Sequence, residues 1–246
     1  MWWPMGKFFF RSDEREGQYV TFAGSTAHHM LNVLRLQPGQ NIVLCDGACT
    51  DYHARLESVV VKPARVTFFL LSSTPSNTET IVPITLYQGM PKGEKMDWII
   101  EKCVELGVSK IVPVCTARTI VKTSAAAKKA ERFARIAESA AGQSMRGIVP
   151  EILSPLSFAE ALAGCSADDL TLVAYEKEQA HTAKSVLAGL PPRPLSLWIG
   201  PEGGFEDGEV QALAEKGGLS ISLGPRILRT ETAGIVALSQ ILCIWE

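Results

Sequence analysis

The 246-residue sequence contains no long hydrophobic run, few histidines and little net charge. None of its segments approaches the roughly 18 to 20 uninterrupted apolar residues that a membrane span needs. The N-terminal stretch MWWPMGKFFF is apolar, but it has neither a basic leader nor a small-residue cleavage site, which argues against a signal peptide. We therefore expect a cytoplasmic protein without a membrane partner.

The six cysteines are scattered along the chain, and only Cys45 and Cys49 are close in sequence. A single C-x3-C without a second pair or nearby ligand histidines is poor evidence for a zinc site. Buried, reduced thiols are the simpler interpretation. We expect no metal in this protein.

The small net charge of −2 hides an uneven distribution of charged residues. Residues 110–149 contain eight Lys or Arg against two Asp or Glu, whereas residues 150–246 contain six against thirteen. This division predicts that a polyanion binds at one surface and that an uncharged or cationic ligand binds at another.

The first part of the chain has the pattern of a small β-barrel. Residues 18–72 alternate short strand-like segments with turn chemistry, and one helix-like insert, TAHHMLNVLRL, interrupts them at 26–36. Residues 72–80 have no apolar periodicity and are typical of a linker. We expect two domains, residues 1–73 and residues 74–246.

The second part alternates strands with helices, which predicts an α/β domain with a mostly parallel sheet. Its last predicted helix, ETAGIVALSQILCIW at 231–245, is apolar on most of its circumference. A surface helix needs only one apolar stripe, so this helix is either deeply buried or half of an interface.

A glycine-rich loop, IGPEGGFED at 199–207, follows the predicted strand LSLWI. Ligands of open parallel sheets bind beyond the carboxyl ends of the strands, where this loop would lie. Its spacing is neither G-x-G-x-x-G nor a Walker loop, and close carboxylates would repel phosphate by roughly 4 kcal/mol per pair. Glu206, Asp207 and Glu209 can complement the dipole of the next helix, but Glu202 precedes that helix and needs another explanation.

A second loop, LGPRILRTETA at 223–233, follows the next predicted strand, and Thr230 can cap the final helix. Two such loops would form a pocket of backbone donors and acceptors suited to a purine edge, a ribose and a zwitterion. S-adenosylmethionine fits such a pocket better than NAD or ATP.

These motifs resemble those of a known family. WIGPEGGFEDGEV followed by SLGPRILRTETAGIVALSQI resembles the SPOUT methyltransferases. The additional segments HHMLNVLRLQPG, KMDWIIEKCVELGVSKIVPV and ESAAGQSMRGIVPEI narrow the resemblance to the RsmE family, which methylates N3 of a uridine in 16S ribosomal RNA. The likeness extends from about Lys7 to Trp245.

The resemblance implies an N-terminal PUA-like β-barrel that binds RNA and a C-terminal SPOUT α/β domain with a deep trefoil knot. It also implies S-adenosylmethionine as cofactor, 16S rRNA within the small ribosomal subunit as substrate, and a homodimer. The implied cofactor-binding positions are Ile199, Gly200, Pro201, Glu202, Gly203, Gly204, Leu223, Gly224, Ile227, Leu228, Thr230 and Thr232.

For catalysis, the proton on N3 of the uracil must leave, so the site needs a base or a cation near the flanking carbonyl oxygens. We expect Arg229 to be that cation and Glu231 to be a weaker candidate for the base. The expected RNA-binding residues are Lys7, Arg11, His28, His29, Arg35, Arg118, Lys122, Arg132 and Arg146. Lys7 stands where the family commonly has Arg, which loses bidentate phosphate geometry.

Two other functions stay open, and a third is disfavoured. The protein could methylate a ribose 2′-oxygen or another base, or it could be a non-catalytic RNA-binding assembly factor. A dinucleotide oxidoreductase is disfavoured because the glycine fingerprint of that class is absent.

Overall fold

The computed structural model describes residues 6–119 and 126–246. The chain divides into two compact units, Met1–Glu79 with Ala141–Val149, and Thr80–Ala140 with Pro150–Glu246. Residues 141–149 therefore belong to the first unit although they come from the middle of the chain. None of the helices in the described ranges is long and apolar enough to cross a membrane.

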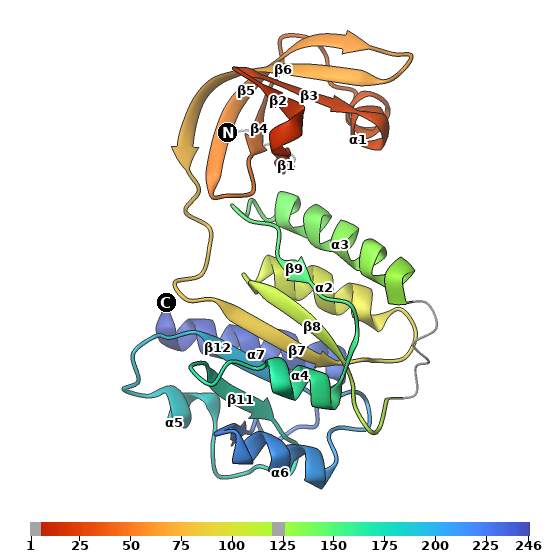
Figure 1. Ribbon diagram of the computed structural model, residues 1–246. Helices are drawn as coiled ribbons and strands as arrows, with labels where there is room; N and C mark the ends of the chain where they lie inside the picture. The colour runs from red at the N-terminus through yellow and green to blue at the C-terminus, as the bar shows by residue number, and fades with distance from the viewer. Residues whose placement is uncertain (1–5, 120–125) are drawn as a thin grey trace. The chain divides into compact units, whose positions relative to one another are not determined.

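The first unit is a half-barrel built on a sheet with the strand order β1-β4-β5-β6-β3-β2 (Figure 1). All neighbours pair antiparallel except β1 and β4. Between the two edge strands, no pairing among the described residues closes the predicted barrel. The strands are β1 (Phe8–Phe9), β2 (Arg15–Glu16), β3 (Tyr19–Ala23), β4 (Asn41–Cys45), β5 (Thr50–Val60) and β6 (Arg65–Pro75).

The core of this unit follows from alternation along its strands. In β3, Val20 and Phe22 are buried while Tyr19 and Ala23 face outward, and Phe22 packs edge-on against Phe68 of β6. The predicted helical insert is present as α1 (Gly24–His28) and the π-helical turn η2 (His29–Val33). A short 3-10 helix, η1 (Ser12–Glu14), precedes β2.

The predicted linker at 72–80 is wrong at its start. Residues 72–75 continue β6 and pair with β5, where Ser72 is opposite His53 and Pro75 is opposite Thr50. Polar side chains are acceptable there because all four residues are exposed.

The second unit contains the predicted parallel sheet, in the order β10-β8-β7-β12-β11-β13, with β9 beside β8. Every strand pair in it is parallel. The strands are β7 (Ile84–Gly89), β8 (Lys110–Cys115), β9 (Glu151–Ile152), β10 (Leu156–Ser157), β11 (Leu170–Ala174), β12 (Leu195–Ile199) and β13 (Leu219–Ile221). The helices are α2 (Lys95–Glu105), α3 (Ala126–Gln143, whose last three residues belong to the first unit), α4 (Phe158–Gly164), α5 (Ala183–Leu187), α6 (Asp207–Glu215) and α7 (Thr230–Trp245).

Helices cover both faces of this sheet. On one face, Trp198 of β12 stacks on Tyr87 of β7 and packs with residues of α4 and α6. On the other face, α2 and α7 pack together, and Gly234 of α7 lies close to Cys103 of α2 and Leu86 of β7. β12 is buried at every position, as expected for a central strand covered on both sides.

The last helix, α7, buries only part of its apolar surface in this chain. Gly234, Ala237, Leu238 and Ile241 are buried, whereas other apolar residues are half-exposed. The half-exposed set is Ile235, Val236, Leu242, Ile244 and Trp245.

Candidate functional site

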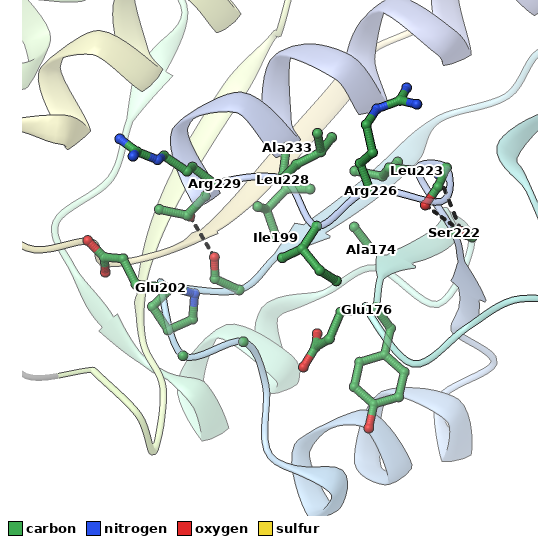
Figure 2. A pocket seen from close by; sticks show the side chains of 18 of the residues that line it. Ala174, Glu176, Ile199, Glu202, Ser222, Leu223, Arg226, Leu228, Arg229 and Ala233 are labelled. Carbon is green, nitrogen blue, oxygen red and sulfur yellow. Dashed lines mark hydrogen bonds between the residues drawn. The ribbon is translucent and has the colours of Figure 1, made fainter.

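A pocket of about 450 Å³ lies at the carboxyl ends of β11, β12 and β13, the edge where parallel sheets bind ligands (Figure 2). Its first wall is the loop at 199–204, and its second wall is the loop at 222–229 leading into α7. A third segment, Ala174–Glu176, follows β11. The lining residues are Lys95, Ala174, Tyr175, Glu176, Ile199, Gly200, Pro201, Glu202, Gly203, Gly204, Ser222, Leu223, Gly224, Arg226, Ile227, Leu228, Arg229, Thr230 and Ala233.

The structure brings together all of the predicted cofactor positions in this lining except Thr232. Arg229 also lines the pocket, whereas Glu231 does not. Sequence reasoning missed Lys95 and Glu176. The end of β11 could have signalled Glu176, because it is a third strand terminus at the same edge of the sheet.

Thr230 joins the two walls at the base of the pocket. Its hydroxyl donates a hydrogen bond to the Gly200 carbonyl at 2.6 Å and accepts one from Gln88 Nε2 at 2.9 Å. Thr230 is only 4% exposed, so water does not compete freely for these bonds. The prediction that Thr230 caps the final helix is wrong, because Arg229 is the N-cap of α7 and the Thr230 hydroxyl instead fixes one wall to the other.

The first wall packs closely on the strand before it. A Cβ on Gly89, the last residue of β7, would lie 2.5 Å from Pro201, so only glycine allows this approach. Gly204 has a φ of +68°, and a Cβ there would meet the Glu176 carboxylate at 2.7 Å. Phe205 is buried and anchors the end of the loop.

The Glu202 carboxylate joins the first wall to the start of α2. It accepts hydrogen bonds from the Lys92 backbone N–H at 3.1 Å and from Lys95 Nζ at 3.0 Å. Burial alone would raise the pKa of Glu202, but hydrogen bonds from the backbone and from Lys95 outweigh it and hold the pKa below its usual range. Glu202 is therefore an anion held by the first turn of α2 and the residues before it.

The other carboxylates of the loop are occupied at the start of α6. Glu206 and Glu209 form a capping box, and the buried Glu209 also accepts a hydrogen bond from the Ala117 N–H at 2.9 Å. Asp207 accepts hydrogen bonds from Lys177 and Tyr175, which lower its pKa. Glu206 and Glu209 therefore serve the helix terminus as the sequence predicts, whereas Asp207 in the first turn of α6 pairs with side chains that follow β11.

Glu176 is different, because its carboxylate lines the pocket and has no hydrogen bond or ion pair with another residue in the described part of the chain. Figure 2 shows it below the second wall, pointing toward the interior. Apolar side chains complete the lining near it, among them Ile199, Leu223 and Leu228. The pocket thus combines apolar contacts, backbone polar groups and one available carboxylate.

Arg226 and Arg229 supply positive charge at the two ends of the second wall, and their side chains extend in different directions (Figure 2). Neither guanidinium has an ion pair with another described residue. Glu231 Oε2 is buried and lies 3.4 Å from Lys95 Nζ, an ion pair whose geometry falls short of a hydrogen bond.

Two of the residues predicted to bind RNA are buried in the first unit. Lys7 is 4% exposed and its Nζ lies 2.5 Å from Asp51, while Arg146 is 1% exposed and pairs with Glu79. Burial argues against direct RNA contact by either side chain. Both cations instead join separate segments of the half-barrel unit.

The remaining predicted RNA residues are exposed, except Lys122, which lies outside the described residues. His28, His29 and Arg35 cluster on and just after the α1–η2 insert. Arg11 pairs locally, and Arg132 pairs with Asp97 and Glu94. Arg118 lies against the pocket, where its guanidinium donates a hydrogen bond to the Gly203 carbonyl at 2.5 Å.

Among the described residues, no group of three or more His, Cys, Asp or Glu side chains is placed to hold a metal ion. The pocket residues do fit an adenosine-and-amino-acid cofactor, because the available carboxylate can accept hydrogen bonds from ribose hydroxyls or an ammonium.

Comparison with known proteins gives matches over almost the entire chain. An RNA methyltransferase domain family matches residues 78–242, and an RNA methyltransferase PUA domain family matches residues 22–63. The chain is 38% identical to ribosomal RNA small subunit methyltransferase E of Bacillus subtilis, covering 92% of this chain and 90% of that protein. It is also 38% identical to the protein of the same name from Aquifex aeolicus, covering 95% and 97%.

Solved structures of methyltransferases also resemble this chain over nearly its whole length. A ribosomal RNA small subunit methyltransferase E from Neisseria gonorrhoeae, bound to S-adenosyl methionine, is 34% identical with a TM-score of 0.89 and covers 98% of both chains. A Legionella pneumophila protein in complex with the same cofactor is 30% identical with a TM-score of 0.87, covering 98% of this chain and 97% of that one.

Proposed function

The chain belongs to the RsmE family of ribosomal RNA methyltransferases, and from that premise we propose that it transfers a methyl group from S-adenosylmethionine to N3 of a uridine in 16S ribosomal RNA. The observation that carries the proposal is the pocket between the two walls. It has the apolar lining and the available carboxylate that such a cofactor needs, and a relative of 34% identity binds that cofactor.

The cofactor would be held mainly by the backbone of both walls, with Glu176 accepting hydrogen bonds from its hydroxyl or amino groups. The bound cofactor supplies an electrophilic methyl group on a sulfonium. The acceptor nitrogen of uracil carries a proton, so the protein must assist the loss of that proton.

Arg229 stabilises negative charge on the uracil carbonyl oxygens as the proton leaves. Its exposed guanidinium lines the pocket and has no competing ion pair among the described residues. Glu231 is the weaker candidate for the base, because its carboxylate is buried beside Lys95 rather than directed into the pocket lining.

RNA binds across the exposed cations of both units. Arg11, His28, His29 and Arg35 contribute from the half-barrel, and Arg118 and Arg132 contribute from the second unit. Phosphate contacts of this kind release counterions, so the affinity for RNA falls steeply as salt rises.

Several further features expected from the family belong to the same proposal. The walls of the pocket form part of a deep trefoil knot, and Thr232 lies beside the cofactor loops. The half-exposed apolar residues of α7 support a homodimer. The protein acts in the cytoplasm on the small ribosomal subunit, with an RNA-binding domain over residues 1–73 and a methyltransferase domain over residues 74–246.

Mapping the methylated nucleotide tests the function. RNA from cells with and without this protein is digested and its nucleosides are identified by mass spectrometry. We expect 3-methyluridine in 16S rRNA to depend on the protein. A lost 2′-O-methyl nucleoside would instead indicate ribose chemistry, and unchanged RNA together with no cofactor binding in calorimetry would indicate an assembly factor.

Single-turnover methylation by Arg229→Ala tests the catalytic role, with Arg226→Ala as the matched control from the same wall. We expect Arg229→Ala to bind cofactor normally and to methylate at least about a hundredfold more slowly, the scale of losing one charge-stabilising group. Full activity of Arg229→Ala would refute the assignment.

A further inference from the structure

Lys95 contacts the first wall of the pocket and the start of α7, the helix that continues the second wall, although it belongs to neither. It is the first residue of α2, and its side chain lines the pocket. Its Nζ lies 3.0 Å from Glu202 Oε1 in the first wall and 3.4 Å from Glu231 Oε2 in the first turn of α7, directly after the second wall. One ammonium therefore bridges carboxylates that come from distant parts of the sequence.

This contact differs in kind from the Thr230 contact at the base. Thr230 is buried and neutral, whereas the Lys95 side chain is 37% exposed and charged. Salt and water weaken an exposed ion pair much more than a buried hydrogen bond. The Lys95 contact can therefore open while the Thr230 contact stays intact.

The start of α2, which carries Lys95, is itself fixed by ion pairs. Arg132 of α3 pairs with Asp97 and Glu94 in the first turn of α2, which fixes the helix start that carries Lys95. The hydrogen bond to Glu202 raises the pKa of Lys95, so the side chain stays charged at neutral pH.

We infer that Lys95 is a positioning residue of the cofactor pocket: its ammonium joins the two walls through Glu202 and Glu231 and holds them closed on bound S-adenosylmethionine. The inference rests on the function proposed above for the identity of the ligand. A cofactor lying between the walls leaves fastest when the exposed bridge opens, so Lys95 controls mainly the dissociation rate.

Three variants test this role. Lys95→Met removes the bridge, Lys95→Arg keeps a cation that can span two carboxylates, and Lys92→Met removes a nearby exposed lysine that holds Glu202 only through its backbone. Dissociation rates are measured by stopped-flow fluorescence for S-adenosylmethionine and for S-adenosylhomocysteine, which lacks the positive sulfonium.

We expect Lys95→Met to release both ligands about five- to tenfold faster, the scale of two partly exposed ion pairs. Lys95→Arg stays within about twofold of the wild type, and Lys92→Met is unchanged. Raising the salt from about 50 mM to about 500 mM accelerates release from the wild type more than from Lys95→Met.

Two results would overturn the inference. One is a wild-type dissociation rate in Lys95→Met. The other is slower release of S-adenosylmethionine from Lys95→Met with unchanged release of S-adenosylhomocysteine, because that would show that the ammonium only repels the sulfonium and does not join the walls.

Hydrogen exchange in the unliganded protein separates this inference from the proposed function. Amides at 199–204 and 223–229 should exchange faster in Lys95→Met than in the wild type or Lys92→Met. If the wild type bound neither ligand, the proposed function would fail, and the exchange rates would still decide whether Lys95 joins the walls.

Discussion

Replacing Thr230 with valine removes the buried link between the walls while keeping a branched side chain of similar size. The hydroxyl is the acceptor for Gln88 Nε2 and the donor to the Gly200 carbonyl. In the valine variant the Gly200 carbonyl loses its hydrogen bond from Thr230. Gln88 Nε2 loses its bond to Thr230 but keeps its hydrogen bond to the Gly89 carbonyl.

The expected loss in the free energy of unfolding follows from these two hydrogen bonds. Each lost hydrogen bond costs about 0.5–1.5 kcal/mol, and a buried group left unsatisfied costs about 1–3 kcal/mol. Because Gln88 keeps one partner, the Gly200 carbonyl bears most of the penalty. We expect the free energy of unfolding of the second unit to fall by about 2–3 kcal/mol.

Tryptophan fluorescence during urea unfolding measures this loss, because three of the five tryptophans, Trp98, Trp198 and Trp245, lie in the second unit. With a slope of roughly 2–3 kcal/mol per molar urea, the midpoint should fall by about 1 M. Thr230→Ser is the control, since it keeps the hydroxyl and should lose less than about 1 kcal/mol. Equal losses in the two variants would show that the methyl group, not the hydrogen bonds, stabilises this junction.

Three further outcomes are expected. Glu79→Ala breaks the buried pair with Arg146 and should destabilise the first unit by about 3–5 kcal/mol in urea titrations followed by circular dichroism, whereas an exposed pair would cost less than about 1 kcal/mol. Burial raises the pKa of the Cys45 thiol to about 12, so the thiol stays protonated and should resist alkylation at pH 8 in the folded protein. Peptide mass spectrometry should find Cys45 alkylated only after unfolding in urea. Gly89→Ala places a Cβ 2.5 Å from the loop after β12, and calorimetry should show weakened cofactor binding even where the fold survives.

The arrangement of strands and helices could be predicted because its signals are local. The apolar run of β12 and the single buried stripe of α2 each identify an element without knowledge of its neighbours. The end of β6 was missed for the same reason. Residues 72–75 are polar and exposed, so only their pairing with β5 marks them as a strand.

The two walls of the pocket were also predictable, because glycine-rich loops follow two strands of a parallel sheet and such strands end at one edge. Lys95 was not predictable in this way. Its position depends on how α2 packs against α7, which no local pattern contains. The prediction that Lys7 and Arg146 contact RNA used the family resemblance for Lys7 and the basic segment for Arg146, and neither reveals burial beside Asp51 and Glu79 from distant parts of the chain.

The acidic residues in and after the first wall do not by themselves explain which ligand the pocket prefers. Glu202 is paired with Lys95, Asp207 with Lys177, and Glu209 with the backbone N–H groups of Ala117 and Glu206. The charge that repels phosphate in a count of the sequence is therefore already compensated by partners within the protein before a ligand enters the cavity. The available carboxylate inside it comes from Glu176, on a segment without the glycine motif. Discrimination in favour of a cationic or hydroxyl-bearing ligand must consequently depend on the end of β11, while the glycine loop supplies shape and backbone contacts.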